Sequence, residues 1–83
     1  MRIQWRPRAV KDFDRLDARV QRRVATALER LAATKQGDVR KLTDTDPPEW
    51  RLRVGDWRVL FARDKAAGVL TVLRVLPRGK AYR

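Results

Sequence analysis

The sequence contains neither cysteine nor histidine. The lack of cysteine excludes disulfide bonds and thiol nucleophiles, and the lack of both residues removes the usual zinc ligands. Without histidine the chain also lacks the side chain that most often acts as a general base at neutral pH. No apolar run approaches the length of a membrane-spanning helix, and the N-terminus lacks the apolar stretch of a signal peptide. We therefore expect a cytoplasmic protein that enters no membrane and uses no metal or cofactor.

Positive charge is what the sequence has in excess. There are 21 Lys and Arg residues against 10 Asp and Glu, which gives a formal net charge of +11 over 83 residues. The excess is spread along the chain rather than confined to a tail. Such a balance predicts a polyanionic partner, which could be a nucleic acid, an anionic membrane or an acidic protein.

The apolar pattern predicts a single domain over residues 1–83, with an N-terminal strand followed by two helices. Alternation over residues 2–6 predicts the strand. Pro7 suits the first turn of a helix, and residues 8–16 place Val10, Phe13 and Leu16 on one apolar stripe. Asp17 is a good N-cap for a second helix over about residues 18–35, and Gly37 lies where a C-cap glycine belongs. Together the helices resemble an αα-hairpin.

The second half of the chain predicts a three-stranded antiparallel meander after a loop over residues 38–48. Its strands are Trp50–Val54, Trp57–Arg63 and Val69–Leu76. We therefore predict an α+β fold in which the helices cover one face of the sheet and leave the other face open.

Strand parity predicts that the open face is rich in arginine. A two-residue turn at Gly55-Asp56, of type II′, would pair Arg53 with Arg58. Arg51 lies on the same face, because side chains alternate along a strand. The other face would hold the core residues Trp50, Leu52, Val54, Trp57, Val59 and Phe61. For the two tryptophans, core packing is a better interpretation than base stacking.

The same argument extends the row of arginines into the last strand. A five-residue loop over residues 64–68 would pair Arg58 with Arg74, and Arg78 would follow if the chain stays extended past Pro77. Five arginines without a carboxylate would then share one face. Arginine suits phosphate because its planar fork donates two parallel hydrogen bonds and stays protonated. The sequence therefore predicts a phosphate-binding face, and RNA is the expected ligand.

Tyr82, near the C-terminus, is the single tyrosine. Neighbouring cations favour its phenolate and lower its pKa, so an arginine cluster could make it a general base. The alternative, an aromatic residue that folds back onto the domain, is equally compatible with the sequence.

Two segments resemble the RelE/ParE toxin superfamily. Residues 41–62, with Trp50-Arg-Leu-Arg-Val-Gly-Asp-Trp-Arg-Val-Leu-Phe at their centre, resemble its central segment. The ending Arg78-Gly-Lys-Ala-Tyr-Arg83 resembles the close of its RelE branch. The resemblance implies a toxin of a type II toxin–antitoxin system that cleaves mRNA in the ribosomal A site. The 2′-hydroxyl of the substrate would act as nucleophile without a metal, leaving a 2′,3′-cyclic phosphate and a 5′-hydroxyl end.

The resemblance also implies roles for individual residues. Arg58 would stabilise charge on the scissile phosphate, Arg78 would be a phosphate ligand and general acid, and Tyr82 would be the base. The further RNA-binding residues would be Arg51, Arg53, Arg74, Lys80 and Arg83. Many relatives have histidine where this chain has Pro77, and RelE-like members often have lysine where it has Arg51 and Arg53.

Two other functions remain open on the sequence. The chain could be a ParE-like toxin that inhibits DNA gyrase without cutting RNA, or an RNA-binding module without catalytic activity. In either toxin interpretation the partner would be an acidic, partly disordered antitoxin protein, because such a segment complements a basic surface. The ribonuclease interpretation adds the ribosome and mRNA as partners.

Overall fold

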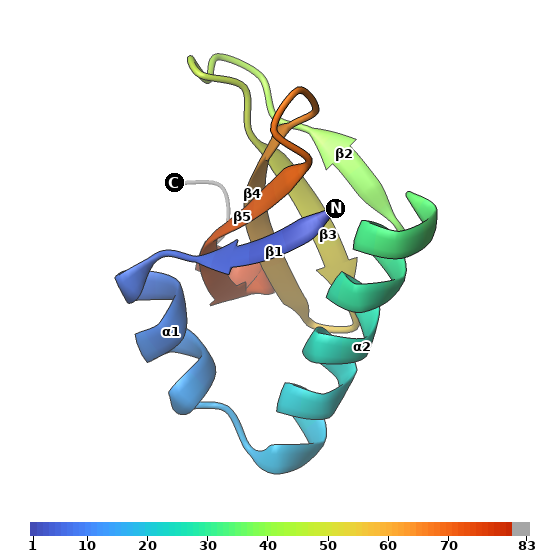
Figure 1. Cartoon of the computed structure of the whole chain (residues 1–83). Helices are drawn as coiled ribbons and strands as arrows, with labels where there is room; N and C mark the ends of the chain where they lie inside the picture. Colours follow the sequence, from blue (N-terminus) through green and yellow to red (C-terminus); the bar gives the residue numbers. More distant parts are fainter. Residues whose placement is uncertain (81–83) are drawn as a thin grey trace.

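The computed structural model describes residues 1–80 as one α+β domain (Figure 1). The elements follow in the order β1 (Arg2–Trp5), α1 (Pro7–Asp14), α2 (Ala18–Thr34), β2 (Val39–Lys41), β3 (Trp50–Val54), β4 (Trp57–Asp64), β5 (Val69–Pro77) and the 3-10 helix η1 (Arg78–Lys80). This order confirms the predicted strand, helix pair and meander. Among residues 1–80, no helix is long and apolar enough to cross a membrane.

The strands form one five-stranded sheet in the order β1-β5-β4-β3-β2. The N-terminal strand β1 pairs with β5 in parallel, and all other neighbours are antiparallel. The prediction of a loop over residues 38–48 was therefore wrong in its first part, because β2 lies within it. β2 pairs with β3 along one side and has only three residues. Three residues are too few to show the alternation that predicts a strand.

The helices form a V beside the sheet (Figure 1), and local signals set their ends. Pro7 opens α1, and the Asp17 side chain accepts a hydrogen bond of 3.0 Å from the backbone N–H of Val20 at the start of α2. The predicted C-cap at Gly37 was wrong. The residue that caps the C-terminal end of α2 is Lys35, which has the left-handed conformation with φ of 61°. Its backbone N–H donates to the carbonyl of Leu31.

The core lies between α2 and one face of the sheet. Its central members are fully buried side chains from α2, β3, β4 and β5, namely Val24, Leu28, Leu31, Leu52, Val59, Phe61, Leu70 and Val72. The first helix contributes Ala9 and an edge-to-face contact between Phe13 and Trp5. Val10, predicted to be part of the α1 stripe, is 42% exposed, because Ala9 faces the core in its place.

The pairing of β4 with β5 differs from the prediction in two ways. The turn is one residue shorter than expected, so that Asp64 pairs with Val69. A bulge between Leu60 and Phe61 then shifts the register by one residue in the same direction. Arg58 therefore lies opposite Leu76, and Arg74 lies opposite Leu60; the predicted pairing of Arg58 with Arg74 was wrong.

A partly buried ion pair fixes α1 to the edge of β5 beyond the end of β1. The Asp12 carboxylate accepts hydrogen bonds from Nε of Arg74 at 2.8 Å, from Nη2 of Arg74 at 3.2 Å and from the backbone N–H of Val75 at 3.0 Å. Burial by itself would raise the pKa of Asp12. The hydrogen bonds from Arg74 and Val75 and the nearby charges of Arg74 and Arg8 outweigh burial and hold that pKa below its usual value.

The Asp12 contacts predict an acid-sensitive contribution to stability. Because the pKa of Asp12 is lower in the folded than in the unfolded protein, its contribution is complete above the ordinary carboxyl pKa of about 3.9 and is lost as the pH falls through the folded value. At pH 7, Asp12→Asn should lower the free energy of unfolding by about 1–2 kcal/mol in urea titrations.

The difference between Asp12→Asn and the wild type should begin to shrink as the pH falls below about 4, because Asp12 of the unfolded wild type then takes up a proton. It should disappear once the pH is also below the lowered pKa of Asp12 in the folded protein. The control is Asp14→Asn, which removes the charge of an exposed carboxylate in the same helix. Equal losses in the two variants at pH 7 would contradict a specific role for Asp12.

Candidate phosphate-binding site

The hairpin of β3 and β4 has the predicted register. Val54 pairs with Trp57 and Arg53 pairs with Arg58 across the turn. Gly55 has φ of +58°, and Asp56 is not among the residues with positive φ, which agrees with a type II′ turn. Arg51, Arg53 and Arg58 therefore have strand positions on the sheet face opposite the core, as parity predicted, and Arg53 also lines a hollow at the edge of β3 beside α2.

The edge strand β2 adds a fourth arginine that the sequence analysis missed. Arg40 pairs directly with Arg51, so both side chains lie on the same face. We call Arg40, Arg51, Arg53 and Arg58 the arginine face. The signal that could have revealed Arg40 is the alternation in Asp38-Val-Arg-Lys41, which is too short to distinguish from a loop.

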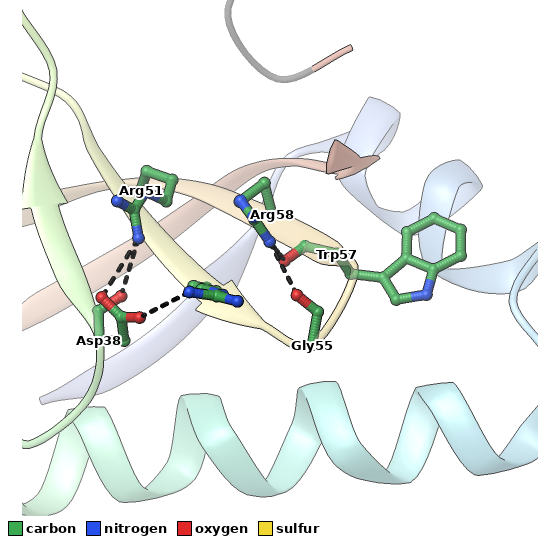
Figure 2. A network of polar contacts seen from close by, with 6 residues as sticks. Asp38, Arg51, Gly55, Trp57 and Arg58 are labelled. Carbon is green, nitrogen blue, oxygen red and sulfur yellow. Dashed lines mark hydrogen bonds and ion pairs between the residues drawn. The ribbon is translucent and has the colours of Figure 1, made fainter. Parts of the chain in front are cut away.

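Arg58 is the central cation of this face. It is 7% exposed, and its Nη1 donates to the carbonyl oxygens of Gly55 and Trp57, each at 2.9 Å (Figure 2). Among residues 1–80, no Asp or Glu forms an ion pair with it. A buried guanidinium without a counter-anion is electrostatically unfavourable, and a bound phosphate would relieve that cost.

Arg51 and Arg53 differ from Arg58 because a carboxylate lies beside them. Nη1 of Arg51 is 3.3 Å from Oδ1 of Asp38, and Nη1 of Arg53 is 4.0 Å from Oδ2 (Figure 2). Arg51 is buried, whereas the Arg53 side chain is 57% exposed. The expectation of an arginine face free of carboxylates was therefore wrong. The expectation considered only the strands of the meander, whereas Asp38 is the residue directly before β2.

The C-terminal residues of the predicted site do not continue the strand β5, and two of them lie outside the described residues. The chain does not stay extended past Pro77, since Arg78 begins η1. The N–H of Arg78 donates to the carbonyl of Asp56 at 2.9 Å, which places η1 beside the hairpin turn. Lys80 is exposed on the same short helix. Tyr82 and Arg83 lie outside the described residues.

Arg74 does not join the arginine face either. Its strand position puts it on that side of the sheet, but its guanidinium is bound by Asp12 of α1. The hydrogen bond to Asp12 raises the pKa of Arg74 above its ordinary value, which outweighs the opposite effect of burial.

The two tryptophans of the hairpin pack against the core, as the sequence analysis favoured. Trp50 stacks on Phe61 with 6.2 Å between ring centroids, and the guanidinium of Arg63 lies 4.6 Å from the Trp50 ring. Trp57 is half-buried, and its indole points away from the guanidinium of Arg58 (Figure 2).

The site can thus bind an anion and stabilise negative charge that develops on it. Four guanidiniums face one carboxylate, and one of the four is already fixed by backbone carbonyls. Fixed cations in a partly buried site stabilise developing charge more strongly than water does. Among residues 1–80, no group of three or more acidic side chains could hold a metal ion.

Comparison with known proteins places this geometry in a family. The family model described as the ParE toxin of the type II toxin–antitoxin system parDE matches residues 3–82. No curated protein sequence matches the chain.

The chain is also similar to solved toxin structures. One is the archaeal RelE-RelB complex from Pyrococcus horikoshii OT3, which is 28% identical in sequence with a TM-score of 0.77. The match covers 96% of this chain and 97% of that chain. The toxin–antitoxin complex RelBE2 from Mycobacterium tuberculosis has 22% identity, 93% and 96% covered, and a TM-score of 0.78. The YoeB/ParE toxin from Agrobacterium tumefaciens has 19% identity, 93% and 98% covered, and a TM-score of 0.76.

The likenesses to the Mycobacterium and Agrobacterium proteins are likenesses of fold, and they confirm the predicted RelE-like arrangement of strand, helix pair and meander. The family match extends over nearly the whole chain and confirms the resemblance to the RelE/ParE superfamily. This protein belongs to the ParE toxin family of type II toxin–antitoxin systems.

Proposed function

We propose that this toxin is a metal-independent endoribonuclease that cuts mRNA in the ribosomal A site and thereby inhibits translation. The observation that carries the proposal is Arg58, a buried guanidinium that no carboxylate among residues 1–80 neutralises. An inhibitor that acts through protein contacts alone has no need to keep such a cation unpaired. A phosphodiester bound at Arg58 would supply the missing negative charge.

In the proposed reaction the 2′-oxygen of a ribonucleotide attacks the adjacent phosphorus. The bond between phosphorus and the 5′-oxygen breaks, leaving a 2′,3′-cyclic phosphate and a 5′-hydroxyl end. Tyr82, as phenolate, takes the proton of the 2′-hydroxyl. The departing 5′-oxygen takes a proton from solvent, because a guanidinium releases its own proton poorly. Arg58 stabilises the extra negative charge on the phosphoryl oxygens in the transition state.

The other arginines would divide the work of binding. Arg53 is exposed and only loosely paired with Asp38, so it is free to contact a phosphate. Arg51 is buried and bound to Asp38, which suits a fixed positive field rather than a mobile ligand. Arg40 extends the binding face toward the edge of the sheet.

The C-terminal segment supplies the remaining residues of the proposed site. Arg78 lies at the hairpin turn through its backbone contact with Asp56 and would act as a phosphate ligand. Lys80 would bind RNA from the same short helix, and Arg83 would contact RNA close to Tyr82.

The partner of the toxin would be an acidic antitoxin that acts in the cytoplasm. The charge of +11 requires a complementary partner, and two of the similar solved structures are toxins in complex with antitoxins. An antitoxin segment that folds across the arginine face would also block substrate phosphate there.

The second candidate is a toxin that inhibits DNA gyrase and does not cut RNA. The family model favours it, because the matched family is named for ParE rather than for RelE. Fold cannot separate the candidates, since the similar structures include both RelE toxins and a YoeB/ParE toxin.

Cleavage of translated mRNA should depend on Arg58 and Tyr82. In a translating extract analysed by primer extension, Arg58→Ala should reduce cleavage about a hundredfold or more, since one donor to the transition state is lost. Tyr82→Phe should reduce it as well, because the phenolate is gone. The matched control is Arg19→Ala, which removes one exposed arginine at the start of α2.

Melting temperatures of the variants will separate loss of the site from loss of the fold. If folded Arg58→Ala and Tyr82→Phe both cut mRNA as well as the wild type, the catalytic proposal is wrong. If the wild type leaves mRNA intact but blocks gyrase-catalysed supercoiling of a plasmid, the second candidate is correct.

Asp38 should compete with substrate phosphate for Arg53. Asp38→Asn should therefore increase the affinity of the protein for a short RNA with 2′-O-methyl groups, which cannot be cleaved, by about threefold at low salt. Glu29→Gln removes the charge of an exposed carboxylate on α2 and should change the affinity less. Fluorescence anisotropy measures both, and weaker binding by Asp38→Asn would show that Asp38 supports the site.

The small protein encoded beside this toxin should bind it tightly and through charge. Co-expression of the two should restore translation, and calorimetry should give an affinity that falls as salt rises. Arg53→Gln should weaken the complex more than Arg19→Gln does, because Arg53 lies on the arginine face. A salt-independent complex, or none, would contradict this expectation.

A further inference from the structure

A second basic surface lies between α1 and the C-terminal end of β5. Two adjoining hollows, of about 270 and 140 Å³, run between α1 and the end of β5 and share Asp12, Arg15 and Arg74. We call them together the α1–β5 groove. They lie outside the arginine face, and the proposed cleavage chemistry does not use them.

The wall formed by α1 is a row of unpaired cations. Arg8 and Lys11 belong to α1, and Arg15 is the residue that caps its C-terminal end. They are spaced by three and four residues, which places them on one side of the helix. All three are exposed, and among residues 1–80 none forms an ion pair. At a rise of about 1.5 Å per residue, Arg8 and Arg15 lie about 10 Å apart along the axis.

The carboxylate inside the groove is already occupied. Asp12 binds Arg74 and the backbone of Val75 at 2.8–3.2 Å. Arg74 therefore balances the charge of Asp12, and the remaining interaction of Asp12 with Arg8 leaves the other cations of the groove without a counter-charge. The groove keeps a positive surplus that only an outside anion can balance.

The end of the groove near the hairpin carries an aromatic ring and a further cation. Trp57, Pro77 and Lys80 line it there. The Trp57 indole is half-buried and points away from Arg58 (Figure 2), so its position suits contact with a base that has already passed the arginine face. Cationic grooves with aromatic side chains are typical of single-stranded nucleic acid binding.

The short helix η1 connects this groove with the arginine face. Arg78 is bonded to the backbone of Asp56 in the β3–β4 turn, and Lys80 lines the groove two residues later. A strand whose phosphate lies at Arg58 could thus continue around the turn along a line of cations. This continuity favours a nucleic acid over an acidic protein as the occupant.

We propose that the α1–β5 groove binds the single-stranded RNA that flanks the scissile phosphate, with phosphates on Arg8, Lys11 and Arg15 and a base on Trp57. The groove rests on the proposed function for the identity of its ligand. Arg74 and Lys80, which were predicted as RNA ligands, belong to this groove rather than to the arginine face.

The test uses two fluorescein-labelled 2′-O-methyl RNAs, of three and nine nucleotides, whose blocked 2′-oxygens prevent cleavage. The triple variant Arg8→Gln, Lys11→Gln, Arg15→Gln should lower the affinity for the longer RNA about tenfold and leave that for the shorter RNA nearly unchanged. For the longer RNA, the slope of log affinity against log salt concentration should also become shallower by about two. The reason is that three phosphate contacts are lost and each contributes about 0.7 to the slope.

The matched control carries Arg2→Gln, Arg19→Gln and Lys65→Gln, three exposed cations outside the groove. Equal loss in the two triple variants would overturn the proposal, because net charge alone would explain the binding. A groove variant that binds the longer RNA normally but no longer binds the antitoxin would overturn it in favour of an acidic protein.

A second readout does not depend on substitutions. A nine-nucleotide RNA with 4-thiouridine should photo-crosslink to Trp57 itself, and crosslinks confined to Arg58 or to the peptide with Trp50 would contradict the groove. Failure of the proposed function is a separate outcome: mRNA would stay intact in the translating extract while the groove variants still lost affinity for the longer RNA.

Discussion

The two-residue turn at Gly55 and Asp56 is the constraint on which the arginine face depends. The turn fixes the pairing of Arg53 with Arg58 and so decides which side chains share a face. It also orients Arg58 directly, because the Gly55 carbonyl accepts from Nη1. From the other side, the guanidinium of Arg23 in α2 lies so close that a Cβ on Gly55 would meet it at 2.9 Å. The Arg23 guanidinium could move aside for a side chain, so it is the φ of +58° that explains why glycine stands here.

The turn imposes an arrangement that stability alone disfavours. Like charges on directly opposed strand positions repel, and this hairpin opposes Arg53 to Arg58 while β2 opposes Arg40 to Arg51. One exposed carboxylate, Asp38, offsets part of this repulsion at the β2 side. Nothing among residues 1–80 offsets it at Arg58. Local rules that a sequence breaks without compensation tend to mark functional positions, which is the physical basis for placing the phosphate there.

Much of the fold and part of the site could be predicted from the sequence, because they depend on neighbours in the chain. The hairpin register, the Asp17 cap and the segregation of core from arginine are all local patterns. The sheet face on which Arg74 lies was also predicted correctly, although the predicted pairing of Arg74 with Arg58 was wrong. The shorter turn and the bulge each shift the register by one residue, and two shifts of one restore the original face.

The failures share a different cause, which is contact with a distant segment. β2 becomes a strand only by pairing with β3, and Asp38 reaches Arg51 only because that pairing places it there. Asp12 binds Arg74 across a separation of 62 residues. No periodicity in the sequence encodes either contact.

Three arginines on the same side of the sheet thus meet three different electrostatic environments. Arg74 is bound by a partly buried carboxylate, Arg51 is bound by an exposed one, and Arg58 is bound only by backbone carbonyls. A carbonyl oxygen orients a guanidinium but does not cancel its charge, whereas a carboxylate orients the guanidinium and also cancels its charge. Arg58 alone of the three therefore combines a fixed position with an undiminished charge, and that combination is what stabilisation of a phosphoryl transition state requires.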